Sequence, residues 1–191
     1  MTEKEKMRRL MLHDCFESEI CDDRFAAYDL CFELNRLPPS EFGKRQELLG
    51  RLLPNAARPI RVLSPFQCEF GYNIYMGEGC TANYGLIILD NAKVTFGHHV
   101  FIGPRCIFTT AVHPLSAEKR RTNRIYAFPI TVGDSVWFGT DVKVLAGVTI
   151  GDGAVIGGGS VVCHDIPPRC LAAGNPARVI RTLDEDIRVG R

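Results

Sequence analysis

The chain has 191 residues, of which 46% are hydrophobic and 24% charged, and its formal net charge is +1. This length and composition suit one soluble globular domain, or a domain with a small addition. The near-neutral charge provides no overall attraction for nucleic acid or membrane, and neither a signal peptide nor a run of roughly 20 apolar residues is present, so we expect a cytoplasmic protein.

Residues 2–53 have the pattern of helices. The apolar residues that recur at helical intervals are Met7, Leu10, Met11, Phe25, Tyr28, Leu30, Cys31, Phe32 and Leu34. Two consecutive prolines then end the second helix, because proline lacks an N–H donor and clashes with the preceding turn. Ser40 is a candidate N-cap for a third helix that runs through Leu53 and stops at Pro54. We assign residues 1–57 to an N-terminal helical region.

Beyond residue 58 the apolar period changes to six. The residues in this register are Phe96, Ile102, Phe108, Val132, Phe138, Val144, Ile150, Ile156 and Val162. All nine are apolar, which chance would give roughly once in a thousand trials at this composition. Glycine follows six of the nine, where we expect it to allow unusual turn dihedrals. A period of six fits no helix and predicts a solenoid of short stacked strands over residues 58–183, followed by a tail at 184–191.

The repeat is interrupted once. From 108 to 132 the register is kept, but residues 114–129 abandon the pattern and include Lys119, Arg120, Arg121 and Arg124. A long loop inside a compact repeat is commonly functional, and His113 stands at its root. The basic residues lack interleaved aromatic side chains, so we expect a solvated loop rather than a surface for nucleic acid.

These hexads resemble the hexapeptide repeats of left-handed parallel β-helix acyltransferases. The resemblance implies a triangular coil of three hexads, or 18 residues, wound in the left-handed sense. We therefore expect a mainly β fold, a left-handed parallel β-helix with an N-terminal α-helical segment.

Further motifs make the resemblance more specific. The helical N-terminus, Asn83, His113-Pro114 and the segment Gly174-Asn175-Pro176-Ala177 are together similar to the maltose, galactoside and nodulation-factor O-acetyltransferases. The resemblance extends over nearly the whole chain. It implies transfer of an acetyl group from acetyl-coenzyme A to a sugar hydroxyl, and a homotrimer with active sites between subunits.

His113 is the candidate general base. The acceptor hydroxyl must lose its proton as its oxygen attacks the thioester, and a neutral imidazole suits that task. The histidine of this His-Pro pair is the catalytic base in the family that the chain resembles.

The resemblance also implies acceptor and coenzyme residues. The candidate acceptor residues are Asp14, Glu69, Asn83 and Asn91. The candidate coenzyme residues are Trp137, Thr140, Gly158, Cys163, His164, Arg178 and Arg181. The sequence departs from the family pattern at three places. Asn91 stands where the galactoside branch has an aspartate, and Ile125 stands where the maltose branch has a glutamate, which leaves the identity of the acceptor open. Cys163-His164 stands where the family commonly has Thr-Lys, which leaves one contact to a coenzyme phosphate open.

No metal site is expected. The eight cysteines contain no Cys-x-x-Cys spacing and are expected to be mostly buried apolar side chains. With 18 residues per coil, His98 and His99 would stack on Ser116 and Ala117, which are not ligands, so both histidines should lie on a turn. His13 has no partner at a suitable spacing.

Two alternatives stay open. One is a xenobiotic (antibiotic) O-acetyltransferase on the same solenoid, although such enzymes usually lack this helical N-terminus. The other is a non-catalytic sugar-binding β-helix, against which His113 at the root of the loop argues. Neither the sugar nor the reacting hydroxyl follows from the sequence.

Overall fold

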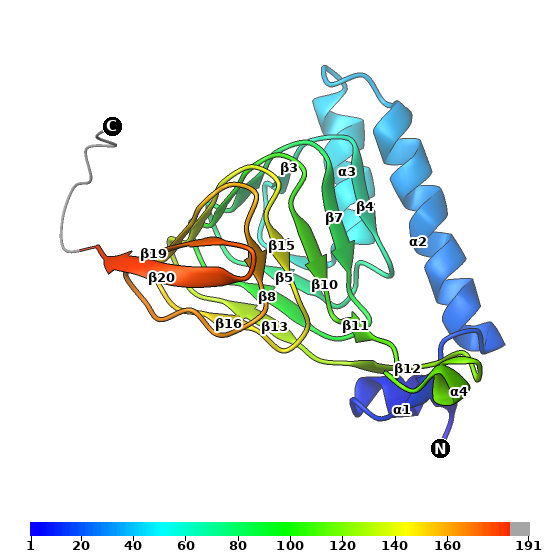
Figure 1. The fold of residues 1–191 in the computed structure, drawn as a ribbon. Helices are drawn as coiled ribbons and strands as arrows, with labels where there is room; N and C mark the ends of the chain where they lie inside the picture. The colour runs from blue at the N-terminus through cyan, green and yellow to red at the C-terminus, as the bar shows by residue number, and fades with distance from the viewer. Residues whose placement is uncertain (184–191) are drawn as a thin grey trace.

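The fold is a left-handed parallel β-helix with helices at its N-terminal end, as predicted (Figure 1). The structure is a computed structural model that describes residues 1–183, so the predicted tail at 184–191 lies outside the described residues. Three sheets form the faces of a triangular prism, and the chain visits them in a repeating order. We call them face 1, face 2 and face 3.

The strands divide among the faces as follows. Face 1 contains β2 (Asn55–Ala56), β5 (Ile74–Met76), β8 (Val94–Phe96), β13 (Ile130–Val132) and β16 (Thr149–Ile150). Face 2 contains β3 (Arg61–Val62), β6 (Thr81–Ala82), β9 (Phe101–Ile102), β14 (Trp137–Phe138), β17 (Val155–Ile156), β19 (Cys170–Gly174) and the antiparallel β20 (Ala177–Thr182). Face 3 contains β4 (Phe66–Cys68), β7 (Leu86–Leu89), β10 (Ile107–Thr109), β15 (Lys143–Val144) and β18 (Val161–Val162).

The core follows the six-residue period. All nine apolar residues of the predicted register are buried, each at most 3% exposed. Their rings stack from coil to coil: the centroid of Phe108 lies 5.0 Å from that of Phe96 and 5.2 Å from that of Phe138. The period therefore predicted the buried column of the solenoid correctly.

The glycines of the repeat have a different cause from the one predicted. None of the six has a positive φ, so unusual dihedrals do not explain them. Instead, neighbouring coils approach too closely for a side chain. A Cβ added at Gly139 would lie 2.7 Å from the amide nitrogen of Gly158, and one at Gly103 would lie 2.6 Å from the carbonyl oxygen of Gly139.

The coil length changes along the solenoid. Residues 20 apart pair in the first coils, as in Ile74 with Val94, whereas residues 18 apart pair later, as in Trp137 with Val155. The two extra residues lie where the chain turns from face 3 to face 1, since the buried residues Ile88 and Phe96 are eight apart there. We call this turn the arm corner, and the turn from face 2 to face 3 the Asn83 corner.

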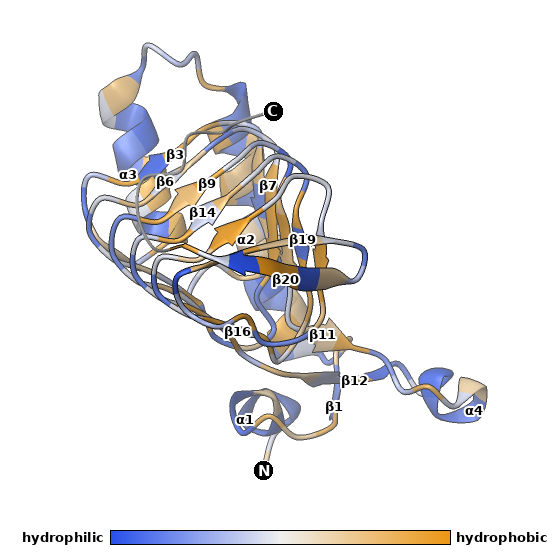
Figure 2. Cartoon of the chain, turned by 60° about the vertical axis from the view of Figure 1, so that its left-hand side comes forward, coloured by the Kyte–Doolittle hydropathy of each residue, from blue (hydrophilic) through white to orange (hydrophobic). Residues whose placement is uncertain are grey.

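The loop at the arm corner is an ordered arm, residues 111–127, rather than the irregular excursion predicted at 114–129. It consists of β11 (Ala111–Val112), α4 (Ala117–Arg120) and β12 (Arg124–Ala127). β12 pairs with β11 and also with β1 (His13–Asp14), forming a small antiparallel sheet. Figure 2 shows the arm and the hydrophilic α4 projecting from the body.

Three helices precede the solenoid: α1 (Glu3–Arg8), α2 (Ser18–Arg36) and α3 (Phe42–Leu52). The predicted continuation of the first helix to Met11 is wrong, because Leu10 has a φ of 58° in the left-handed region. Ser40 does not cap the third helix, which begins after Glu41 without a side-chain cap. Within residues 1–183 none of the helices has the length and apolarity needed to cross a membrane.

Candidate functional site

His113 lies at the arm corner. It directly follows β11, whose register is fixed by pairing Ala111 with Ala127 and Val112 with Tyr126 of β12. The side chain is exposed, so its imidazole is open to a substrate from solvent. Its position at the root of the arm is therefore set by strand pairing, because β12 pairs with β11 on one side and with β1 on the other.

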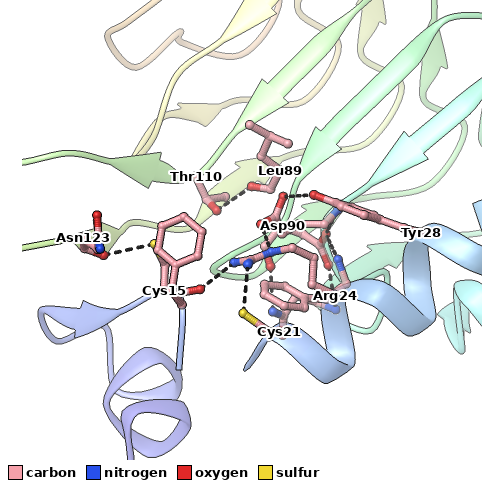
Figure 3. Close-up of polar contacts among 12 residues, drawn as sticks. Cys15, Cys21, Arg24, Tyr28, Leu89, Asp90, Thr110 and Asn123 are labelled. Atoms are coloured by element: carbon pink, nitrogen blue, oxygen red, sulfur yellow. Dashed lines mark hydrogen bonds and ion pairs between the residues drawn. The ribbon is translucent and has the colours of Figure 1, made fainter. Parts of the chain in front are cut away.

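Glu69, the first residue after β4, is held by two residues of α2. Arg24 donates from Nε to its Oε1 over 2.6 Å, and the hydroxyl of Tyr28 donates to its Oε2 over 3.2 Å (Figure 3). Arg24 also donates from Nη2 to the carbonyl oxygen of Cys15, which follows β1. Burial, then the charge of Glu69, raise the pKa of Tyr28 to about 12, so Tyr28 stays a donor at neutral pH. This cluster joins α2, β1 and β4 beside the arm.

Two buried polar side chains brace the arm corner behind this cluster. The carboxylate of Asp90 accepts the backbone N–H groups of Glu69 at 3.0 Å and Phe70 at 2.9 Å. One coil later, Thr110 accepts the N–H of Ala92 at 2.9 Å. Both side chains are fully buried and appear together in Figure 3. They supply acceptors that the widened turn needs for its backbone donors.

The predicted acceptor residues are not all in one place. Asp14 lies in β1, where it pairs with Arg124 of the arm, and it directly precedes Cys15, whose carbonyl oxygen accepts from Arg24 of the Glu69 cluster. Asn83 lies at the Asn83 corner, and its Oδ1 accepts the N–H of Tyr84 at 2.9 Å.

Asn91 occupies a third environment. Its side chain is buried and lines a cavity of about 390 Å³ together with Arg8, Asn73 and Lys93. This cavity lies between α1 and face 1, and neither Glu69 nor His113 lines it.

The predicted coenzyme residues follow two edges of the prism. Trp137 is half exposed on face 2, beside the equally exposed Phe101 of the preceding coil. Thr140 and Gly158 follow on the Asn83 corner, where the hydroxyl of Thr140 donates to the carbonyl oxygen of Pro104. Cys163 and His164, by contrast, follow β18 at the arm-corner edge, in the last coil (residues 155–172).

Arg178 and Arg181 point to the same side of β20. Residues three apart in a regular strand would point to opposite sides. A bulge in the β19–β20 ladder changes this, because Arg178 pairs with Ala173 and Arg181 with Leu171. Both guanidinium groups are exposed, so the two cations can bind a phosphate together.

The prediction that His98 and His99 stack on Ser116 and Ala117 of the next coil was wrong. Because the arm is outside the stack, His98 lies between Glu78 and Asp134, not beside Ser116. Its Nδ1 accepts the backbone N–H of Glu78, and its backbone N–H donates to Oδ1 of Asp134. His13 is fully buried, with Nδ1 next to the carbonyl oxygen of Met11. Across residues 1–183 no three His, Cys, Asp or Glu side chains gather as a metal site would require.

One chain thus places His113, Asp14 and the Glu69 cluster at the arm corner, and Asn83, Thr140 and Gly158 at the Asn83 corner. Sequence reasoning missed Arg24, Tyr28, Asp90 and Thr110. The helical period assigned Tyr28 only as an apolar residue, and no sequence motif marks Arg24.

Two family models match the chain. Residues 129–164 match the bacterial transferase hexapeptide repeat, and residues 6–56 match the maltose acetyltransferase hexapeptide capping motif. A relative from Escherichia coli, galactoside O-acetyltransferase, is 38% identical over 185 residues, which cover 97% of this chain and 90% of the relative.

Solved structures are similar over the same extent. A maltose O-acetyltransferase from Clostridium difficile superimposes with a TM-score of 0.94 at 39% identity, covering 97% of this chain and 99% of that one. A galactoside acetyltransferase in complex with coenzyme A gives a TM-score of 0.92 at 38% identity, covering 96% and 92%.

Proposed function

The chain belongs to the maltose and galactoside O-acetyltransferase family and is an acetyltransferase, and we propose that it transfers the acetyl group of acetyl-coenzyme A to a hydroxyl of a mono- or oligosaccharide. The observation that carries the proposal is the position of His113. The exposed His113 follows β11 at the same corner of the prism at which Glu69 follows β4, and Glu69 with Arg24 and Tyr28 offers acceptors and donors that suit sugar hydroxyls.

In the proposed reaction His113 removes the proton of the acceptor hydroxyl while that oxygen attacks the thioester carbonyl carbon. The carbon–sulfur bond then breaks, and the departing coenzyme thiolate receives from His113 the proton that the acceptor hydroxyl lost. No covalent enzyme intermediate is needed. The side-chain amide of Asn83 contributes a donor. Its Oδ1 already accepts the backbone N–H of Tyr84, and its Nδ2 can donate to an oxygen in the site.

The coenzyme is proposed to lie along face 2. Trp137 and Phe101 offer an apolar surface, the exposed backbone at Gly158 admits the pantetheine arm, and Arg178 with Arg181 pairs with phosphate. We place the reaction in the cytoplasm, where acetyl-coenzyme A is made and free thiols stay reduced.

A homotrimer would join the two corners. In the described strands, four of the seven outward side chains of face 3 are aliphatic, whereas face 1 has none; the four are Ile87, Leu89, Ile107 and Val161, beside Gln67, Thr109 and Lys143. An aliphatic face favours burial against other copies. If face 3 of each chain faces a threefold axis, rotation brings the Asn83 corner of one chain to the arm corner of the next.

The test is an acceptor panel with release of coenzyme thiol as the readout. Maltose, glucose, galactosides, chitin oligomers and a hydroxylated antibiotic are compared at equal concentration. The proposal expects the largest kcat/KM with a sugar. A larger value with the antibiotic would assign the chain to xenobiotic acetylation, and no turnover with any acceptor would favour a binding role.

A further inference from the structure

Two buried thiols from distant parts of the chain touch each other. Cys31 of α2 and Cys68 of β4 have their Sγ atoms 3.8 Å apart, and the two residues are 5% and 2% exposed. Within residues 1–183 no other two thiols contact each other in this way. Cys80 and Cys106, for example, donate to the carbonyl oxygens of Gly97 and Gly139. The pair therefore differs from the other buried cysteines, which act as small core residues.

A cavity leads to this thiol pair. It has a volume of about 470 Å³, lies between α2 and face 3, and is lined by both cysteines together with Tyr28, Phe32 and Leu89. A small uncharged oxidant fits such a space and can diffuse to it even where face 3 packs against other copies, whereas a peptide-sized disulfide such as oxidised glutathione is too large to reach sulfurs this buried.

The two thiols are not equivalent. The contact with the Cys68 thiol lowers the pKa of Cys31. The same contact, together with burial, raises the pKa of Cys68. Because the thiolate is the reactive form, Cys31 is the sulfur that attacks first and Cys68 the one that resolves.

We propose that Cys31 and Cys68 form an oxidative modification site, which hydrogen peroxide converts into a disulfide between α2 and β4. The Cys31 thiolate attacks one peroxide oxygen, the O–O bond breaks, and the departing hydroxide becomes water, which leaves a sulfenic acid. Cys68 then loses its proton, attacks the Cys31 sulfur and displaces a second water. Two thiols are oxidised by two electrons, and one peroxide is reduced to two waters.

The two sulfurs are already in contact, so we expect the bond to form with little movement: the sulfur distance must close from 3.8 Å to about 2.05 Å. The crosslink would join α2 to β4, the strand that directly precedes Glu69. On the helix its position, Cys31, lies three residues after Tyr28. Linking positions 31 and 68 also restricts the unfolded chain, so the oxidised protein should be more stable to heat.

The native protein is treated with a small molar excess of hydrogen peroxide, and the remaining thiols are blocked before digestion. We expect the intact mass to fall by two hydrogens, a peptide map to show Cys31 joined to Cys68, and reductant to reverse both changes. The melting temperature should rise by roughly 5 °C or more. Cys106→Ser should behave like the wild type, whereas Cys31→Ser and Cys68→Ala should form no crosslink.

Other outcomes would overturn the inference. These are oxygen addition to the cysteines without a crosslink, a crosslink between other cysteines, or a Cys31–Cys68 bond that forms only in denaturant. The wild-type peptide map decides the matter even if a cysteine variant fails to fold. The inference does not depend on the proposed acetyl transfer, because none of its readouts measures activity.

Discussion

Arg24 and Glu69 form an ion pair of 2.6 Å that ties α2 to the end of β4. The side chains are only 12% and 14% exposed, so both charges are largely removed from water. Burial works against the charge of Arg24, yet the neighbouring carboxylate raises its pKa overall. The pair also fixes Arg24 against the backbone of Cys15, so one contact positions both the helix and the strand β1 below the arm.

Replacing Arg24 by methionine should therefore destabilise the protein by about 2–4 kcal/mol, because Glu69 would keep a buried charge without its cation. Urea denaturation measures the free energy of unfolding. Arg36→Met, an exposed position of the same helix, is the matched control and should stay within about 0.5 kcal/mol of the wild type. Equal effects of the two substitutions would show that the ion pair contributes nothing specific.

Asp90 predicts a stability that depends on pH. Burial raises the pKa of its carboxyl to about 6, against the opposing effect of backbone N–H donors, whereas an aspartate in an unfolded chain has a pKa near 3.9. Between these values the folded protein holds a proton that the unfolded chain has released. This residue therefore stabilises the fold progressively as the pH falls from 7 to 5.

The variant Asp90→Asn lacks this pH-dependent contribution to stability. The other titrating groups are the same in both proteins, so their effects cancel when the stability of the variant is subtracted from that of the wild type. The stability of the wild type minus that of Asp90→Asn should thus increase by about 1 kcal/mol from pH 7 to pH 5. Urea denaturation of both proteins at the two pH values measures it. A difference that stays constant, or shrinks in acid, would contradict a raised pKa at Asp90.

His113→Ala should lower kcat by roughly 10²-fold or more, because the acceptor hydroxyl would lose its base. The KM for acetyl-coenzyme A should change little, since the proposed coenzyme surface lies on face 2. Initial rates with the best acceptor give both constants, and a circular dichroism spectrum checks that the variant is folded. A folded variant that retains most of its kcat would exclude His113 as the base.

The sequence predicted the solenoid because its core repeats every six residues, and Phe108 and Phe138 take the places that the period assigns. It did not predict the 20-residue coils, because the predicted register begins at Phe96 and the two extra residues between Ile88 and Phe96 shift the earlier apolar positions out of that register. The sequence also showed no sign that the arm leaves the stack, and for that reason the expected neighbour of His98 was Ser116 instead of Asp134. Similarly, Leu10 and Met11 have helical spacing but follow a helix that has already ended.

The candidate site was only partly predictable. His113 stays a prediction, made because a histidine marks the point where the repeat stops. Glu69 was named from the family resemblance, but Arg24, which holds it, is 45 residues away in the chain and belongs to no motif. Long-range polar pairs of this kind depend on how the helices pack on the first coil, and local periodicity carries no information about that packing.

The separation of the two corners predicts that each active site needs two chains. His113 stands at the arm corner, and the coenzyme surface with Arg178 and Arg181 is on face 2. His113→Ala and the double variant Arg178→Ala/Arg181→Ala, each inactive at low acetyl-coenzyme A, should therefore rescue each other when they are refolded together. Random mixing in a cyclic trimer leaves both intact halves at about a quarter of the interfaces, so activity should recover to about that fraction of the wild type. Mass spectrometry under native conditions confirms that mixed trimers have formed, and each variant refolded alone is the control. Mixed trimers that stay inactive would mean that each chain supplies both halves of its own site.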